Sequence, residues 1–290
     1  MYLLLFGAIL LFGMQTVCFK EFTRRFMQNK ADYFFFSGLY FLIVVVLLLA
    51  INGFRPIQPQ TWLIAVPFGI LFILAILLYM RAMEVGSLSF SALVFSFGLL
   101  VPVLAGQLFW GESISLLQVL ALVVLLASFY LAGGVKLESG RRFNVTWLVL
   151  ILTAMLGNGV LMTLSKYHQR ILPGRDVGEF LIVAFATAAL ASAFLTLFRS
   201  AVGKERISRP KGAPFVLLVA GAGVTTAFGN WIALHLAGNM PAVLLFPVMN
   251  GGIVFASSVL SVLLFKEKMT RRISAGMALG LAALVMISLG

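Results

Sequence analysis

The fold class is decided by residues 241–265, PAVLLFPVMNGGIVFASSVLSVLLF, which contain no charged side chain. About 20 mostly apolar residues are enough for one helix to cross a bilayer, so this run predicts a membrane-spanning helix. The rest of the chain has the same character, because 62% of its 290 residues are hydrophobic and only 10% are charged. Soluble domains carry about 25% charged residues. We therefore expect an integral membrane protein.

Nine further apolar runs, bounded by charged residues, Pro or Gly, have the length of a membrane span. The ten predicted helices lie at 2–22, 33–51, 61–81, 87–109, 114–133, 146–166, 178–199, 214–236, 241–265 and 272–289. Their short connections leave no room for a receptor ectodomain or a nucleotide-binding domain. The expected fold is all-α, with ten transmembrane helices.

The chain divides into two related halves of five helices. An offset of 155 residues aligns Glu112 with Glu267, and an offset of 146 aligns Lys20 with Lys166. Five is an odd number, so the second half must enter the membrane in the opposite sense, as an inverted repeat. We expect one repeat at 1–134, a basic loop at 135–145 and a second repeat at 146–290.

The formal charge of +12 comes from 21 Lys and Arg against 9 Asp and Glu. In a membrane protein this excess of positive charge indicates the orientation of the helices and not a nucleic-acid partner, because cytoplasmic loops accumulate Lys and Arg. The loops after helices 1, 3, 5, 7 and 9 hold 17 of the 21, leaving Arg55, Lys166, Arg170 and Arg175 on the other side. We therefore expect a multi-pass protein of the inner, cytoplasmic membrane with both termini outside the cytoplasm.

Four short motifs lie at corresponding places in the two halves. They are Phe12-Gly13 followed by Lys20, Asn158-Gly159 followed by Lys166, Gly111-Glu112, and Lys266-Glu267. In these motifs the chain resembles the drug/metabolite transporter superfamily, specifically its tandem EamA-type members with ten helices. The resemblance covers nearly the whole chain and implies a transporter. The family is usually described with cytoplasmic termini, whereas the loop charges of this sequence predict the opposite.

A transport pathway needs polar groups near the middle of the membrane, where they are otherwise costly. Five polar side chains lie near or just past the middle of predicted helices and are expected to bind the substrate: Gln15, Thr16, Asn158, Asn230 and Asn250. Together they predict a polar site with an aromatic or apolar lining.

Six residues are expected to break or loosen the helices beside these polar groups: Gly13, Gly157, Gly159, Pro247, Gly251 and Gly252. Pro247 has no N–H, so the carbonyl of Val243 loses its helical partner. Asn250 either binds substrate or satisfies this altered backbone, since irregular backbone at membrane depth is tolerated where it is buried or lines a cavity. The glycines fit close helix packing equally well.

Three basic side chains near helix ends are candidates for gating or anchoring. Lys20 and Lys166 either extend toward the lipid headgroups or act as cationic gates or substrate anchors. His235 is either an interfacial structural residue or a proton-coupling group. Glu112 and Glu267 are expected to be structural, because each precedes a helix whose dipole favours a carboxylate.

The positions of the nine acidic residues restrict the substrate. All of them fall at predicted helix ends or in loops, so a cation would find no carboxylate at mid-membrane. It would need an aromatic cage instead. We therefore predict a neutral, zwitterionic or anionic substrate.

The leading prediction is a secondary active transporter that moves a small organic metabolite by alternating access. Two alternatives stay open: a flippase for a lipid-linked substrate, and an amine or cation transporter with an aromatic cage. An intramembrane enzyme is not expected, because His168, His235 and Cys18 are isolated and no paired carboxylates lie at depth.

The expected partners follow from this function. They are the small-molecule substrate, membrane lipid, and either protons or a counter-substrate if the substrate's own gradient does not supply the energy. No cofactor, metal or nucleic acid is expected. Ten helices are enough to enclose a pathway, so we expect a functional monomer.

Overall fold

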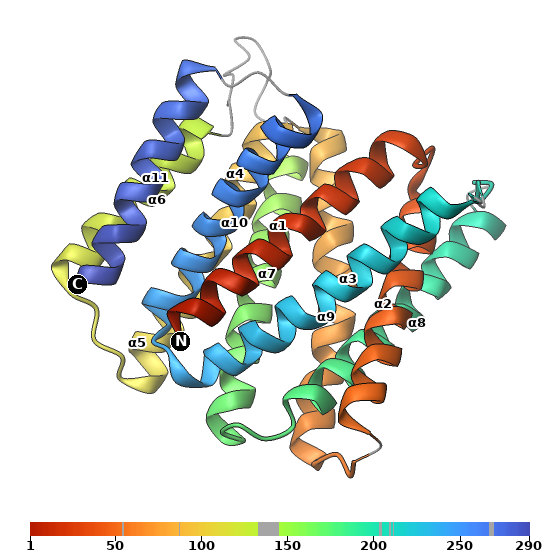
Figure 1. The fold of residues 1–290 in the computed structure, drawn as a ribbon, viewed down its shortest axis with the longest axis horizontal. Coiled ribbons are helices and arrows are strands. Elements are labelled where there is room, and N and C mark those ends of the chain that lie inside the picture. Colours follow the sequence, from red (N-terminus) through yellow and green to blue (C-terminus); the bar gives the residue numbers. More distant parts are fainter. Residues whose placement is uncertain are drawn as a thin grey trace. The chain divides into compact units, whose positions relative to one another are not determined.

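The computed structural model describes residues 1–53, 55–86, 88–132, 145–202, 205–208, 210, 212–266 and 270–290. Every regular element in these ranges is helical (Figure 1). The elements are α1 (Tyr2–Arg25), α2 (Lys30–Asn52), α3 (Pro59–Val85), α4 (Leu88–Ser96), the 3-10 turn η1 (Phe97–Leu99), α5 (Leu100–Trp110), α6 (Leu116–Ala132), α7 (Val145–Ile171), α8 (Val177–Ala201), α9 (Ala213–Asn239), α10 (Ala242–Phe265) and α11 (Arg271–Leu289). The predicted all-α class is confirmed. The predicted basic loop at 135–145 lies almost wholly outside the described residues.

The helices have the length and surface of membrane spans. Nine stretches in the described ranges are long and apolar enough to cross a bilayer, with α4, η1 and α5 counted together as one. The tenth, α6, has 17 residues and is apolar but shorter. Large apolar side chains such as Leu63 and Leu108 are 75% and 74% exposed on their helices. Such exposure suits a surface that faces lipid, so the chain is a multi-span membrane protein.

The interruption of a helix lies in the fourth predicted span and not in the ninth. The 3-10 turn at Phe97–Leu99 separates α4 from α5. In contrast, α10 is helical throughout Pro247, Gly251 and Gly252, so the expected break there is corrected. The two helices that contain Gly13, Gly157 and Gly159 also continue through them. A single missing N–H at Pro247 removes one hydrogen bond, and the neighbouring turns keep the helix.

The described chain forms two compact units. Unit 1 comprises Met1–Ile73 and His168–His235, and unit 2 comprises Leu74–Tyr167 and Leu236–Gly290. The boundaries fall inside α3, α7 and α9. Each unit therefore combines segments from both halves of the sequence.

Unit 1 is built around α2 and α8, which pack along each other. Small residues lie at this contact, and a Cβ on Gly38 of α2 would lie 3.7 Å from the Cβ of Ser192 on α8, which is an ordinary van der Waals distance. Aromatic rings fill the remaining core. Phe22 and Phe36 stack with centroids 4.0 Å apart, and the rings of Phe41 and Phe185 lie 5.4 Å apart.

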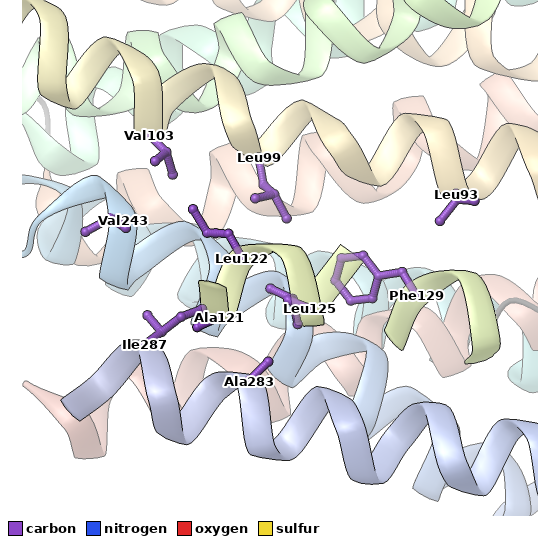
Figure 2. Packing of buried hydrophobic residues seen from close by; sticks show 10 residues of the cluster. All are labelled: Leu93, Leu99, Val103, Ala121, Leu122, Leu125, Phe129, Val243, Ala283 and Ile287. Atoms are coloured by element: carbon purple, nitrogen blue, oxygen red, sulfur yellow. The ribbon is translucent and has the colours of Figure 1, made fainter. Parts of the chain in front are cut away.

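Unit 2 contains a second closely packed helix pair, α6 and α11. Figure 2 shows the buried cluster between this pair, the fourth span and α10. Its members are Leu93, Leu99, Val103, Ala121, Leu122, Leu125, Phe129, Val243, Ala283 and Ile287. The cluster is aliphatic apart from Phe129, whereas the core of unit 1 is rich in aromatic rings.

Candidate functional site

Two predicted binding residues of unit 1 meet at Thr226. The Gln15 Nε2 of α1 donates to Thr226 Oγ1 of α9 at 2.5 Å. The Asn230 Nδ2 donates to the Thr226 backbone carbonyl at 2.9 Å, and Thr226 Oγ1 itself donates to the Ala222 carbonyl at 2.6 Å. Thr226 is 2% exposed. The structure thus joins α1 and α9 through the Gln15–Thr226 hydrogen bond, and the Asn230 amide is satisfied within α9 beside it.

Thr16 lies next to Gln15 but has a different environment. Its side chain is exposed, and its Oγ1 donates to the Phe12 carbonyl of the same helix at 2.9 Å. Thr16 is therefore satisfied within α1 and takes no part in the Gln15–Thr226 contact.

Asn158 lies at the interruption of the fourth span, within unit 2. Its Nδ2 is 3.1 Å from the point that a Cβ on Gly98 would occupy. At the next position a Cβ on Gly159 would overlap the side chain of Val101 and lie 2.6 Å from the Gly98 carbonyl oxygen. The 3-10 turn and α7 therefore approach so closely that two glycines are required.

Asn250 and Gly251 occupy packed positions of α10, also in unit 2. The Asn250 Nδ2 donates to the Phe246 carbonyl of its own helix at 2.8 Å. A Cβ on Gly251 would lie 2.8 Å from Leu284 Cδ2. The cavity beside Gly251 has a volume of about 20 Å³, which is room for roughly one water molecule. A metabolite does not fit there.

Lys166 is buried, which corrects the expectation that it extends to the lipid headgroups. Its side chain is 1% exposed, and its Nζ lies 2.8 Å from Glu112 Oε1. The ammonium also donates to the Met240 carbonyl at 2.6 Å and lies 5.8 Å from the centroid of the Trp110 ring. Its symmetric counterpart Lys20 is partly buried on α1.

The Glu112 carboxylate lies at the N-terminus of α10, whereas it was predicted to lie at the N-terminus of the helix that follows it. Gly111 ends α5 in the left-handed conformation, with φ 65°, and thereby turns the chain before Glu112. The Glu112 Oε2 accepts the Ala242 backbone N–H at 2.6 Å. The carboxylate therefore lies at the N-terminus of α10, not at that of the following helix α6, and favours that dipole. Its counterpart Glu267 lies outside the described residues.

A cavity of about 660 Å³ opens in unit 1 where α2 ends and α8 begins; we call it the Arg55–Arg175 cavity. Its lining residues are Asn52, Arg55, Pro56, Gln58, Gly174, Arg175, Asp176, Val177, Gly178, Glu179, Trp231 and His235. The rings of Trp231 and His235 are nearly parallel, at 14°, with centroids 6.4 Å apart. His235, a predicted gating residue, is thus placed on the wall of a cavity.

The cavity and the Gln15–Thr226 contact are separate features of α9. His235 follows Thr226 by nine residues, which is about two and a half helical turns or about 13.5 Å along the axis. The two side chains therefore project from opposite sides of the helix. Thr226 contacts α1, and His235 lines the cavity.

A buried network that includes the cavity-lining residue Asp176 was not predicted. Thr61 Oγ1 donates to Asp176 Oδ2 at 2.8 Å and lies 3.0 Å from His168 Nε2. A hydroxyl has one hydrogen, so Nε2 of His168 must donate to Thr61. Gln169 Nε2 lies 3.0 Å from His168 Nδ1, and its Oε1 accepts the Gly174 N–H at 3.2 Å. The ring is therefore neutral, with its hydrogen on Nε2.

The described residues contain no group of three or more His, Cys, Asp or Glu side chains that could hold a metal ion. The polar groups described above are amides, hydroxyls, imidazoles, guanidinium groups, and carboxylates that are ion-paired or hydrogen-bonded. This chemistry suits reversible binding of a small polar molecule.

Comparison with known proteins adds family and fold. Residues 1–134 match the EamA-like transporter family. A search of curated proteins found no match. Among the matching solved structures is one described only as the crystal structure of a protein, with a TM-score of 0.75 and 18% identity, covering 99% of this chain and 97% of that chain. That likeness shows a shared fold over the whole length. The predicted resemblance is confirmed over residues 1–134, which match the EamA-like transporters, a family of membrane transporters of the drug/metabolite type.

Proposed function

We propose that the protein is a secondary active transporter that moves a small organic metabolite across the cytoplasmic membrane by alternating access. The observation that carries the proposal is the family match over residues 1–134 in a chain of many membrane-spanning helices. The organisation into two compact units, each with segments from both sequence halves, supports it. Two units that change their relative position expose a site to each side of the membrane in turn.

The helix pairs inside the units favour an inverted repeat. In the proposed repeat α2 corresponds to α8, and α6 corresponds to α11. Each of these pairs packs together within one unit. Helices α5 and α10 also end alike, because Gly111 and Lys266 both adopt the left-handed conformation just before a glutamate. Equivalent ends in the two halves are what a duplicated sequence would produce.

The Gln15–Thr226 contact is the proposed substrate-binding feature of unit 1, with Asn230 beside it. A ligand with a hydroxyl, amide or carboxylate would exchange hydrogen bonds with these side chains at little cost, since they already satisfy one another when it leaves. Asn158 and Asn250 are proposed as polar binding residues of unit 2. Lys20, Lys166 and His235 are proposed to gate or anchor. Every acidic residue in the described ranges lies at a helix end or in a connection, which favours neutral, zwitterionic or anionic substrates.

Three further features belong to this proposal. We infer that the protein works as a monomer, that its termini lie outside the cytoplasm, and that protons, a counter-substrate or the substrate's own gradient supply the energy. The loop charges support the orientation.

The test begins with a thermal-stabilisation screen of the purified protein against amino acids, sugars, nucleosides, amines and phosphorylated metabolites. Uptake of each stabilising compound is then measured in proteoliposomes for Gln15→Ala, Thr226→Ala and Asn230→Ala. The matched control is Thr225→Ala, because Thr225 Oγ1 donates to the Gly221 carbonyl of its own helix at 2.7 Å. Reduced uptake in the three variants but not in the control supports the site. Unchanged uptake in all four rejects it.

A further inference from the structure

We propose that the Arg55–Arg175 cavity binds the oxyanion group, a carboxylate or a phosphate, of a soluble metabolite. The proposal deepens the transport function proposed above and rests on it for the identification of this metabolite as the substrate. The binding site itself is a feature of unit 1 alone, since every lining residue belongs to that unit.

The size of the cavity fits a metabolite. Its volume of about 660 Å³ lies within the range of small-molecule sites, about 300 to 1,000 Å³. Polar and charged side chains from α2, the connection before α3, the α7–α8 turn and α9 converge on it. The cavity is therefore large enough to take a whole small molecule together with its charged group.

The cavity is lined by two carboxylates, which accept hydrogen bonds from neighbouring groups, and by two arginines. Asp176 Oδ2 accepts hydrogen bonds from the Gln58 N–H at 2.9 Å and from Thr61. Glu179 Oε1 accepts from Asn52 Nδ2 at 2.6 Å. These bonds hold both carboxylates to the wall.

Arg55 and Arg175 are both exposed, and within the described ranges neither side chain forms an ion pair or a hydrogen bond. The guanidinium group presents a planar fork of N–H donors that matches a carboxylate or phosphate in two parallel hydrogen bonds. Two such forks on one cavity favour an oxyanion over an ammonium group.

The same cavity also offers an apolar surface for the rest of the molecule. Trp231 is 44% exposed and stacks on His235. An indole face binds aromatic or aliphatic groups. The cavity therefore combines guanidinium groups with an aromatic surface, which is the composition expected of a site for an organic acid or an organic phosphate.

Two residues that line the cavity, Asn52 and Glu179, are held in place by packing and a hydrogen bond. A Cβ on Gly178 would lie 2.9 Å from Asn52 Cγ, so this glycine lets α8 pack against the side chain that holds Glu179. The buried His168–Thr61–Asp176 network holds the lining residue Asp176. Asn52, Asp176 and Glu179, which line the cavity beside the two arginines, therefore have defined partners.

The binding test uses the purified full-length chain in a lipid-free neutral detergent. The probes are inorganic phosphate and phenylacetate, with phenylacetamide as the uncharged control, and binding is measured by calorimetry. We expect both anions to bind and phenylacetamide to bind more weakly. Arg55→Gln and Arg175→Gln should each weaken binding of both anions about tenfold or more, because each removes charge-assisted hydrogen bonds. Arg81→Gln is the matched control, since Arg81 is an exposed arginine outside the cavity lining.

Three results would overturn the proposal. They are no binding of either anion to the wild-type chain, equal binding in the Arg55→Gln/Arg175→Gln double variant, and equal binding of phenylacetamide. The same measurement in nanodiscs of phosphatidylglycerol and of phosphatidylcholine separates a lipid from a metabolite. Phenylacetate binding that is present in detergent and in phosphatidylcholine but lost in phosphatidylglycerol would assign the cavity to an anionic lipid headgroup and reject the soluble ligand.

Transport and binding fail in distinguishable ways. Arginine-dependent binding without uptake in proteoliposomes would keep the oxyanion site and reject the transport function. Uptake of an organic acid that is unchanged in both arginine variants would keep transport and reject the cavity as its substrate site.

Discussion

At the scale of single residues, the most consequential contact is the ion pair of Lys166 and Glu112. Both residues stand out in the sequence, because each belongs to a motif that recurs in the other half. Their pairing could not be predicted, since it depends on the left-handed turn at Gly111 and on the position of the Met240 carbonyl. Removing one member of such a pair leaves the other charge buried without compensation.

The Lys166→Met and Glu112→Gln variants should each lose about 3 to 5 kcal/mol of stability. The double variant should recover part of that loss, because neither charge remains. The readout is the apparent melting temperature of the purified protein. Arg81→Gln, which breaks an exposed ion pair with Glu84, should change stability by less than about 1 kcal/mol. Equal losses of stability in Lys166→Met and Arg81→Gln would show that the buried ion pair stabilises the protein no more than an exposed one.

The His168–Thr61–Asp176 network makes a second prediction at this scale. Thr61→Val should cost about 1 to 3 kcal/mol, because it leaves Asp176 and His168 without their shared partner. Thr153→Val is the control, since Thr153 is exposed and bonds to the Val149 carbonyl of its own helix. Thermal unfolding of the two variants gives the comparison, and a Thr61→Val protein as stable as Thr153→Val would contradict the network. No local signal reveals this network, because Thr61 lies 107 residues from His168.

At the scale of helices, the positions of all ten apolar runs were predicted and the irregular segment was not. Length and hydropathy determine where a span lies, so these positions can be read from sequence alone. The 3-10 turn depends on a tertiary approach, in which Gly98 packs against α7 at Met155 and Gly159. Pro247 was the more visible signal, but its helix continues through it. Prolines are tolerated in membrane helices when neighbouring groups satisfy the backbone.

Gly159→Ala should therefore destabilise the protein even though alanine is the better helix former. Its Cβ would overlap Val101 and approach the Gly98 carbonyl, which is backbone and cannot move cheaply. We expect a loss of about 1 to 3 kcal/mol, typical of overpacking. Gly7→Ala is the matched control, because no atom lies within 4 Å of the added Cβ and alanine should stabilise the helix slightly. If thermal unfolding ranked the two variants in the opposite order, the close approach of α7 to the 3-10 turn would be wrong.

At the scale of the whole molecule, composition and loop charge predict a membrane class and an orientation. The division into two units was not predicted, because it joins α2 with α8 and α6 with α11, which lie far apart in the chain. Of the five predicted binding residues, Gln15 and Asn230 share a contact through Thr226, which links them only once α1 and α9 have packed. The hydropathy pattern and the position within a predicted helix identify the polar residues near the middle of the membrane. The hydrogen-bond partners of these residues depend on tertiary packing.

The proposed orientation gives a labelling pattern. Cys18 is the only cysteine of the chain, so Cys18→Ser provides a background for single cysteines. In intact cells, a membrane-impermeant maleimide should label Gln58→Cys, between the second and third spans, and should leave Arg24→Cys unlabelled until the cells are opened. The reverse pattern would place the termini in the cytoplasm and would overturn the orientation that the loop charges predict.

Counterflow in proteoliposomes tests the central claim most directly. Vesicles are loaded with an unlabelled compound that stabilises the purified protein, and entry of the labelled compound is followed without ATP. A secondary transporter should accumulate label transiently above its external concentration, and Thr226→Ala should reduce that accumulation more than Thr225→Ala does. No accumulation beyond that of protein-free vesicles, for any stabilising compound, would contradict the transport function.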